Sequence, residues 1–158
     1  MANSTSANLK LTVQATGENS GTWGQITNTN LLILEQAIGG FTTFNITNAA
    51  RSLTFTNGAL SNGKNEVIKL TGTLASNLTV SIPNSLEKTY LVEDACNHAG
   101  NTLTFKTASG TGVLLCEGNN YTLYSDGTNV VKLHEQRNWR AISAAETVQA
   151  GAKLLVNT

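Results

Sequence analysis

The spacing of apolar residues divides the chain into a helical N-terminal part and a long part rich in β-structure. Alternation of apolar and polar residues over 9–15 predicts a short amphipathic strand. Helical spacing follows over 22–38, where Thr22 and Gln25 have the separation of a capping box. Gly39-Gly40 is expected to end this helix, because glycine tolerates the left-handed conformation common at helix C-termini.

The predicted helix carries more apolar surface than one buried face requires. A stripe this wide argues for burial on more than one side. We therefore expect an interface with a second copy of the chain or with a docking partner. The interface candidates in the helix are Trp23, Ile26, Leu31, Leu32, Ile33, Leu34 and Ile38.

The remainder of the chain has the pattern of a mainly β protein. Phe44–Ile46 and Leu53–Phe55 suggest two short strands, and seven further strands are predicted over 66–71, 77–82, 88–94, 101–106, 112–116, 120–125 and 129–134. Their regular spacing favours an antiparallel β-sandwich or barrel-like module over βαβ units. Asp126-Gly127 is placed to form a hairpin turn, and no internal repeat of ~20–50 residues is evident.

This organisation suggests three segments. Residues 1–48 form an N-terminal attachment region with a strand and the helix, 49–135 form the β-sandwich module, and 136–158 form a connector. Trp139 in the connector is interpreted as a further interface residue. Residues 154–156 resemble the first strand of another module, which suggests that the chain is the proximal part of a longer fibre. A strand that pairs with a neighbouring chain is the alternative.

Composition restricts the classes of partner. The formal net charge is +0 and charged residues make up only 13%, and basic residues are scattered singly, so we expect no nucleic-acid binding. The N-terminus is polar and uncharged, unlike a signal peptide, and no apolar run is long enough for membrane insertion.

The sequence contains few patterns of residues typical of catalysis or ligand binding. Cys96 and His98 lie close together without a second ligand pair, and Cys96 and Cys116 are expected to be free thiols. Asp94 is expected to cap the end of a strand, and Tyr90 and Tyr121 are expected in the core. No nucleophile elbow or phosphate-binding loop is present in the sequence, so we predict no catalytic residues, no cofactor and no metal.

Several segments resemble structural proteins of marine tailed phages. Gly-Thr-Trp-Gly, Thr-Asn-Thr-Asn and Glu-Gln-Ala-Ile-Gly-Gly within 21–40 are similar to the N-terminal segment of tail-fibre and related virion proteins, those of cyanophages especially. Further similarity to the β-rich module of such proteins covers 69–74, 78–83, 88–93 and 124–131.

The resemblance implies a non-enzymatic virion protein. The expected function is that of the particle-proximal part of a homotrimeric tail fibre, which docks on the tail through its N-terminus and carries host-attachment modules. Its expected partners are other virion proteins of the tail tube, adaptor or nozzle, and it would be made in the bacterial host cytoplasm. A capsid decoration (cement) protein, bound to the capsid, is the alternative.

Overall fold

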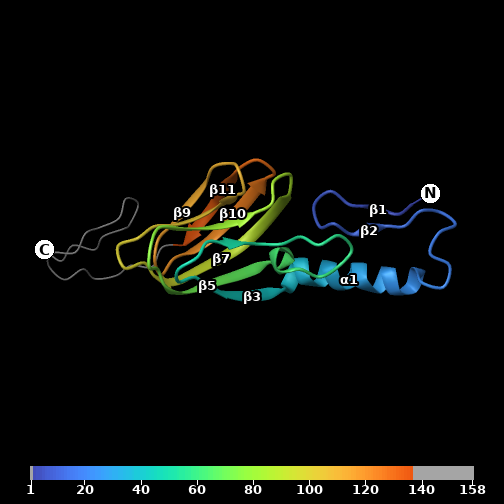
Figure 1. The fold of residues 1–158 in the computed structure, drawn as a ribbon, viewed down its shortest axis with the longest axis horizontal. Helices are drawn as coiled ribbons and strands as arrows, with labels where there is room; N and C mark the ends of the chain where they lie inside the picture. The colour runs from blue at the N-terminus through green and yellow to red at the C-terminus, as the bar shows by residue number, and fades with distance from the viewer. Residues whose placement is uncertain (1, 137–158) are drawn as a thin grey trace, which may run out of the picture.

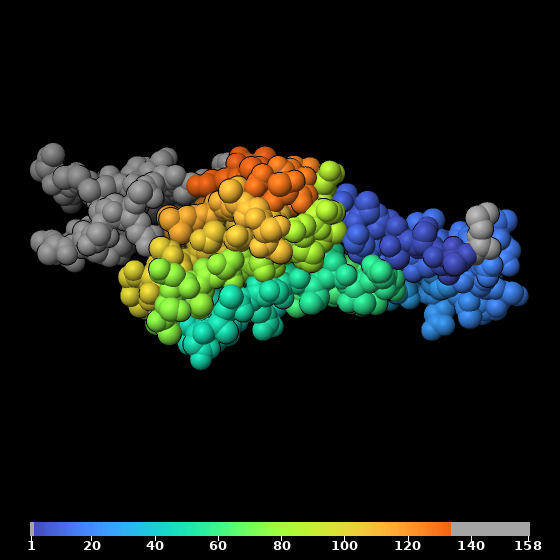
Figure 2. All heavy atoms as spheres, turned by 45° about the horizontal axis from the view of Figure 1, so that its top comes forward, coloured from blue at the N-terminus to red at the C-terminus, as the bar shows by residue number. Residues whose placement is uncertain are grey.

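The computed structural model describes residues 2–136, which form a mainly β structure with one α-helix. A small N-terminal arm, defined here as residues 2–40, projects from one end of a larger β module (Figure 1). Figure 2 shows the same arm, in blue, extending from the body of the molecule. The molecule is therefore elongated, with the helix at one end.

The arm consists of a short hairpin packed against the helix. Its elements are β1 (Ser4–Thr5), β2 (Thr12–Val13) and α1 (Trp23–Gly39). The side chain of Asn30 on α1 both accepts a hydrogen bond from the backbone N–H of Thr12 (2.9 Å) and donates one to its carbonyl (2.8 Å). One amide therefore fastens β2 to the helix, much as a neighbouring strand would.

The ends of α1 agree with the predicted helix over 22–38, but the predicted capping contacts at both ends are wrong. Thr22 precedes the helix without a side-chain capping bond, and its hydroxyl donates to the carbonyl of Asn19 instead. Gly40 follows the helix in an extended conformation (φ −70°, ψ 137°) rather than a left-handed one. A Cβ at Gly40 would collide with the carbonyl oxygen of Gln36, so glycine is required here for close packing.

Two mixed sheets form the β module. The five-stranded sheet has the order β11 (Val130–Gln136), β10 (Asn120–Asp126), β7 (Glu87–Asn97), β5 (Val67–Thr73) and β3 (Phe41–Asn45). The four-stranded sheet has the order β4 (Arg51–Ser52), β6 (Leu78–Ile82), β8 (Leu103–Thr107) and β9 (Gly112–Leu115). A short 3₁₀ helix, η1 (Asn62–Lys64), lies between β4 and β5. All seven strands predicted after residue 65 are confirmed, with shifts of a few residues at their ends.

The purely antiparallel prediction is wrong, because the chain winds back and forth between the two sheets. From β3 to β8, successive strands alternate between sheets, and each pairs in parallel with the strand of the previous turn. Residue 41 pairs with 67 and residue 67 with 91, so the chain returns to the five-stranded sheet after 26 and then 24 residues. This winding is that of a short β-solenoid, and it is a structural repeat that the sequence did not reveal.

Side-chain hydrogen bonds join the turns of this winding. The side chain of Asn77 accepts from the backbone of Thr102 (2.9 Å), and Asn101 donates to the carbonyl of Leu74 (3.0 Å). Asn84 and Ser109 exchange two further hydrogen bonds. The abundance of Asn and Ser thus contributes to stacking as well as to turn formation.

The other end of each sheet is antiparallel. β9 pairs with β8, β10 pairs with β7, and β11 pairs with β10. The predicted hairpin at Asp126-Gly127 is confirmed: Gly127 has φ +87°, and the Asp126 side chain accepts from the backbone of Thr128 and Asn129. β9, β10 and β11 therefore complete the two sheets after the parallel winding of β3 to β8.

One hydrophobic core lies between the two sheets. It contains Phe44, Ile68, Leu70, Val80, Leu103, Phe105 and Leu123, together with Tyr90 and Tyr121 as predicted. No residue of α1 belongs to this cluster. The β module therefore makes this core, and the buried Ile33 of α1 lies outside it.

Candidate assembly surface

The interface residues predicted in α1 separate into two groups. Trp23, Leu31, Leu32 and Ile38 are 65%, 57%, 50% and 78% exposed. Such a concentration of large apolar side chains on one short helix is unusual for a surface that faces only water. These four residues are free to contact a partner.

Ile33 is a correction to the predicted interface. It is 0% exposed and is the one buried residue of the helix, so it packs within its own chain. It lies three residues after Asn30, on the face that binds β2. Ile26 and Leu34 are half-buried, and Trp139 lies outside the described residues. The chain's own hairpin therefore covers one side of the wide apolar stripe.

The helix offers almost no charge to a partner. It has no acidic residue in its first turn and no basic residue in its last turn. Glu35 is the only charged residue between Trp23 and Gly39. Contacts to this surface must therefore rely on apolar burial and on amide and hydroxyl groups.

A second apolar row crosses the outward face of the five-stranded sheet, and sequence reasoning missed it. Phe41 on β3 pairs with Val67 on β5, which in turn pairs with Leu91 on β7. Phe41 and Leu91 are 59% and 41% exposed. The signal was present in the sequence: Leu91 lies between the inward-facing Tyr90 and Val92, so alternation places it outside.

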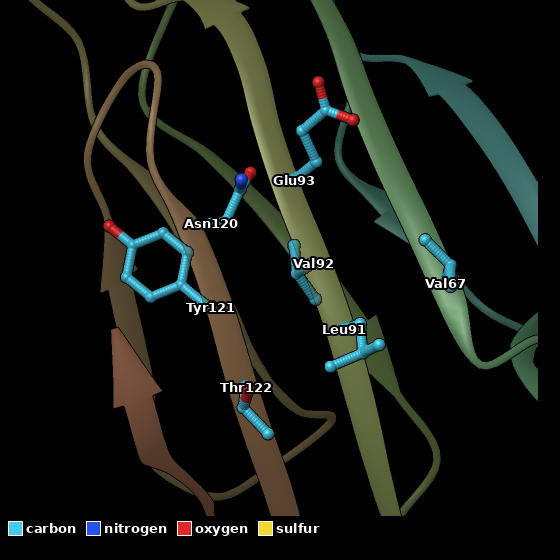
Figure 3. Close-up of a pocket in the computed structure, with 7 residues that line it drawn as sticks. All are labelled: Val67, Leu91, Val92, Glu93, Asn120, Tyr121 and Thr122. Carbon is cyan, nitrogen blue, oxygen red and sulfur yellow. The ribbon is translucent and has the colours of Figure 1, made fainter. Parts of the chain in front are cut away.

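This row borders a depression on the sheet (Figure 3). The depression is lined by Val67, Leu91, Val92, Glu93, Asn120, Tyr121 and Thr122. At its margin the Lys69 ammonium lies 2.7 Å from the Glu93 carboxylate. The charges beside the depression are thus paired within the chain, and its floor remains partly apolar.

A groove lies where the arm meets the β module. Residues of the hairpin loop, Ile38 of α1 and Thr89 of β7 line it together. Lys88 at its base is 3.1 Å from Glu66 and also donates to the carbonyl of Thr89. Desolvation lowers the pKa of Lys88, although the hydrogen bond and charge of Glu66 act in the opposite direction. This ion pair joins β7 to Glu66, the residue just before β5, and the Lys88 ammonium also donates to the carbonyl of Ala37 in α1 (3.5 Å).

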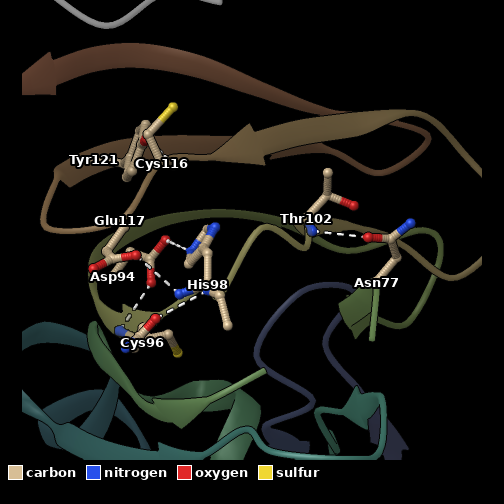
Figure 4. A network of polar contacts seen from close by, with 10 residues as sticks. Asn77, Asp94, Cys96, His98, Thr102, Cys116, Glu117 and Tyr121 are labelled. Atoms are coloured by element: carbon tan, nitrogen blue, oxygen red, sulfur yellow. Dashed lines mark hydrogen bonds and ion pairs between the residues drawn. The ribbon is translucent and has the colours of Figure 1, made fainter. Parts of the chain in front are cut away.

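A buried polar cluster lies at the end of β7 (Figure 4). Asp94, which was expected to cap a strand, is inside β7 at 0% exposure, and its carboxylate is 2.8 Å from Nε2 of His98. Desolvation alone would lower the pKa of His98, but the hydrogen bond and charge of Asp94 and the charge of Glu117 outweigh it, so this pKa is raised. Glu117 also accepts from the backbone N–H of His98 (2.9 Å), which ties the β7–β8 turn to the β9–β10 loop.

This cluster has the character of a structural element. His98 and Asp94 are enclosed, and burial raises the pKa of the neighbouring Cys96 thiol to about 12. Cys96 and Cys116 are free thiols, as predicted. Among residues 2–136 no three His, Cys, Asp or Glu side chains are grouped so that they could hold a metal ion. In the same part of the chain no helix has the length and hydropathy needed to cross a bilayer.

Comparison with known proteins assigns no relative: no family model, no curated protein and no solved structure matches this chain.

Proposed function

We propose that this chain is a non-enzymatic structural protein of a tailed-phage virion, namely the particle-proximal part of a homotrimeric tail fibre. In this proposal the N-terminal arm docks onto the tail, and the wound β module begins the shaft that carries the host-attachment modules.

The observation that carries the proposal is the position of the segment that resembles phage fibre proteins. Residues 21–40, which contain its three motifs, form α1 and its two ends. This helix lies in an arm that projects from the β module (Figure 1). It presents Trp23, Leu31 and Ile38 to its surroundings instead of to the core. A docking segment requires such a surface, whereas a helix that only stabilises its own domain does not.

The second support is the architecture that follows the arm. The other segments of resemblance lie in β5, β6, β7 and the β10–β11 hairpin. Three of these strands belong to the solenoid-like winding, in which each turn contacts its neighbours. Such winding suits a fibre because further turns or modules extend the structure along one direction.

The hydrogen bonds of His98 and Lys64 stabilise the fold, which supports a role without catalysis, although Nδ1 of His98 is buried without a hydrogen-bond partner among residues 2–136. Asp94 of β7 holds the His98 ring, and Glu117 accepts from the His98 backbone and so joins two loops. The ammonium of Lys64 donates to the carbonyls of Thr56 (2.7 Å) and Ala59 (2.6 Å). These groups stabilise turns and do not converge on an open cavity. The wholly buried Lys64, whose pKa is lowered by desolvation, fastens the loop before η1.

Immunogold electron microscopy of particles tests this proposal. Antibodies raised against the purified protein should label the tail of the phage that carries the gene. Gold confined to the capsid surface would contradict the fibre assignment and support capsid decoration. Labelling of neither part, with the protein present only in the lysate, would contradict a virion role altogether.

A further inference from the structure

Two buried lysines lie close to the junction of the N-terminal arm and the β module. Lys64 is 0% exposed and Lys88 is 9% exposed. An ammonium group is seldom buried, because its removal from water costs free energy that only hydrogen bonds or an opposite charge can offset. The groups that bind each ammonium therefore show which parts of the chain the two lysines hold together.

Lys88 joins the start of β7 to the end of α1. Its ammonium donates to the Glu66 carboxylate (3.1 Å) and to the carbonyl of Thr89 (3.2 Å). It also donates to the carbonyl of Ala37 in α1 (3.5 Å), so each N–H of the ammonium has an acceptor. The last carbonyls of a helix lack partners within the helix and carry partial negative charge. Because α1 has no basic residue in its last turn, Lys88 supplies this positive charge from β7.

Lys64 acts on the arm through the loop that it fastens. Its ammonium donates to the carbonyls of Thr56 and Ala59. Between these two residues, the backbone N–H of Gly58 donates to the carbonyl of Lys10 in the hairpin of the arm (2.7 Å). The loop that Lys64 holds is therefore one of the contacts of the arm.

Two further hydrogen bonds cross the same junction. The backbone N–H of Ser61 donates to the side chain of Gln36 on α1 (3.3 Å). The backbone N–H of Glu87 donates to the side chain of Asn8 in the hairpin loop (3.0 Å). Figure 1 shows that the hairpin loop and the end of α1 both reach the β module. Both parts of the arm are thus bonded to it, and a rotation of the arm would break bonds on each.

The covalent connection between α1 and β3 is also fixed. Only Gly40 separates the two elements. Its N–H donates to the carbonyl of Gln36 (2.9 Å), and its carbonyl accepts from the N–H of Val67 (2.9 Å). Flexible linkers are longer and behave as solvated random coils. This connection has neither property.

We propose that Lys88, together with the loop that Lys64 fastens, holds the arm in one orientation relative to the β module, so that the arm is a rigid extension and not a flexible tether. This rigidity rests on contacts within the chain. Its consequence for a virion, namely that the docked arm sets the direction of the shaft, rests on the proposed function.

Residual dipolar couplings of backbone amides test the proposal in the full chain. In the wild type, one alignment tensor of one magnitude should fit the amides of α1 and those of β5, β7 and β10. Lys88→Met keeps an apolar side chain but removes the ammonium. It should reduce the couplings of α1 relative to those of the strands by at least about a third, because a mobile helix averages its couplings.

Lys69→Met is the matched control for this variant. Lys69 lies on the neighbouring strand β5 and pairs with Glu93 of the same sheet. Its replacement should leave the couplings of α1 equal to those of the wild type.

A second variant keeps both buried lysines. Gln36→Ala combined with Asn8→Ala removes two acceptors of the arm, and neither residue belongs to the hydrophobic core. The couplings of α1 should fall in this variant as well, so the test does not depend on the folding of Lys88→Met. Gln25→Ala is its control, because Gln25 is exposed in the first turn of the same helix. This control should have no effect.

Three results would overturn the rigid arm. The first is a wild-type chain in which α1 already needs a separate tensor or has couplings reduced to this extent. The second is a folded Lys88→Met variant with wild-type couplings in α1 or, if that variant does not fold, the same result for the double alanine variant. The third is a Lys69→Met variant that frees α1 as much as Lys88→Met does. None of these outcomes bears on where the protein lies in the virion, which the immunogold experiment decides.

Discussion

Neighbouring leucines on β9 face opposite sides of the four-stranded sheet. Leu115 is 0% exposed and belongs to the core, whereas Leu114 is 47% exposed. Alternation along the strand alone produces this difference. The same alternation made the buried strand positions predictable from the sequence.

These two leucines give a matched test of the core. Leu115→Ala should lower the free energy of unfolding by about 2–5 kcal/mol, because it removes transfer energy and leaves a cavity. Leu114→Ala should change it by less than about 0.5 kcal/mol. Urea unfolding of both variants measures the difference, and equal losses would contradict the assignment of the two faces.

The Asp94–His98 pair predicts a particular dependence of stability on pH. The pKa of His98 is raised above its usual value of 6.5. Its contribution to the free energy of unfolding is therefore complete below pH 6.5 and is lost as pH rises through the folded-state pKa. Asp94→Asn removes the carboxylate that raises this pKa, and should cost about 1–3 kcal/mol at pH 6. In that variant the loss of stability above neutral pH should disappear or reverse.

Urea midpoints from pH 6 to 9 provide this measurement. Glu93→Gln is the control, because Glu93 forms a partly exposed ion pair with Lys69 away from the histidine. It should keep the wild-type slope. A variant at Asp94 with the wild-type pH dependence would show that the pair does not control the protonation of His98.

At the scale of elements, the junction between α1 and β3 depends on one of two adjacent glycines. A Cβ at Gly40 would collide with the Gln36 carbonyl and lie 2.6 Å from the side-chain oxygen of Asn65. A Cβ at Gly39 would meet nothing within 4 Å. The requirement at Gly40 is therefore steric, although the sequence had suggested a left-handed backbone.

Replacement of Gly40 by alanine and replacement of Gly39 by alanine should affect stability differently. Gly40→Ala should destabilise the protein by more than about 1 kcal/mol, because backbone atoms must move. Gly39→Ala should be neutral or stabilising by up to about 1 kcal/mol, because alanine favours the helix. Thermal unfolding of the two variants checks this order, and a more damaging substitution at Gly39 would contradict it.

The positions of the strands could be predicted from the sequence, but their pairing could not. Parallel sheets usually have both faces covered, so their strands are apolar almost throughout. Here β5, β6 and β8 are covered on one side only, and in β6 buried residues alternate with half-buried ones along the whole strand. Their alternating sequences therefore resemble those of antiparallel strands. The repeat was hidden because it consists of a returning backbone path and not of repeated residues.

The interface prediction for α1 was limited by a similar ambiguity. The sequence indicated that the stripe was too wide for one buried face, but it could not assign each side to its partner. Two hydrogen bonds join Asn30 to Thr12 of the hairpin, and Ile33 is completely buried. One side of the helix therefore packs against the chain's own hairpin. Phe41 and Leu91 were missed because an apolar residue at an outward strand position is ambiguous until its neighbours across the sheet are known.

At the scale of the whole molecule, the core and the attachment surface occupy different parts of the chain. The hydrophobic cluster begins at Phe44, whereas four of the exposed large apolar residues lie in α1. Removal of the arm should therefore leave the main core intact. The two roles that we propose, docking and shaft formation, can be separated by one deletion.

The measurement that tests the account most directly is the amount of this protein on particles whose gene lacks residues 2–40. Quantitative mass spectrometry of purified particles should find the truncated protein absent from the virion, while the fragment remains folded and soluble in the lysate. The full-length chain, supplied from a plasmid, should restore its normal copy number. Particles that carry the truncated protein at that same copy number would contradict docking through the N-terminal arm.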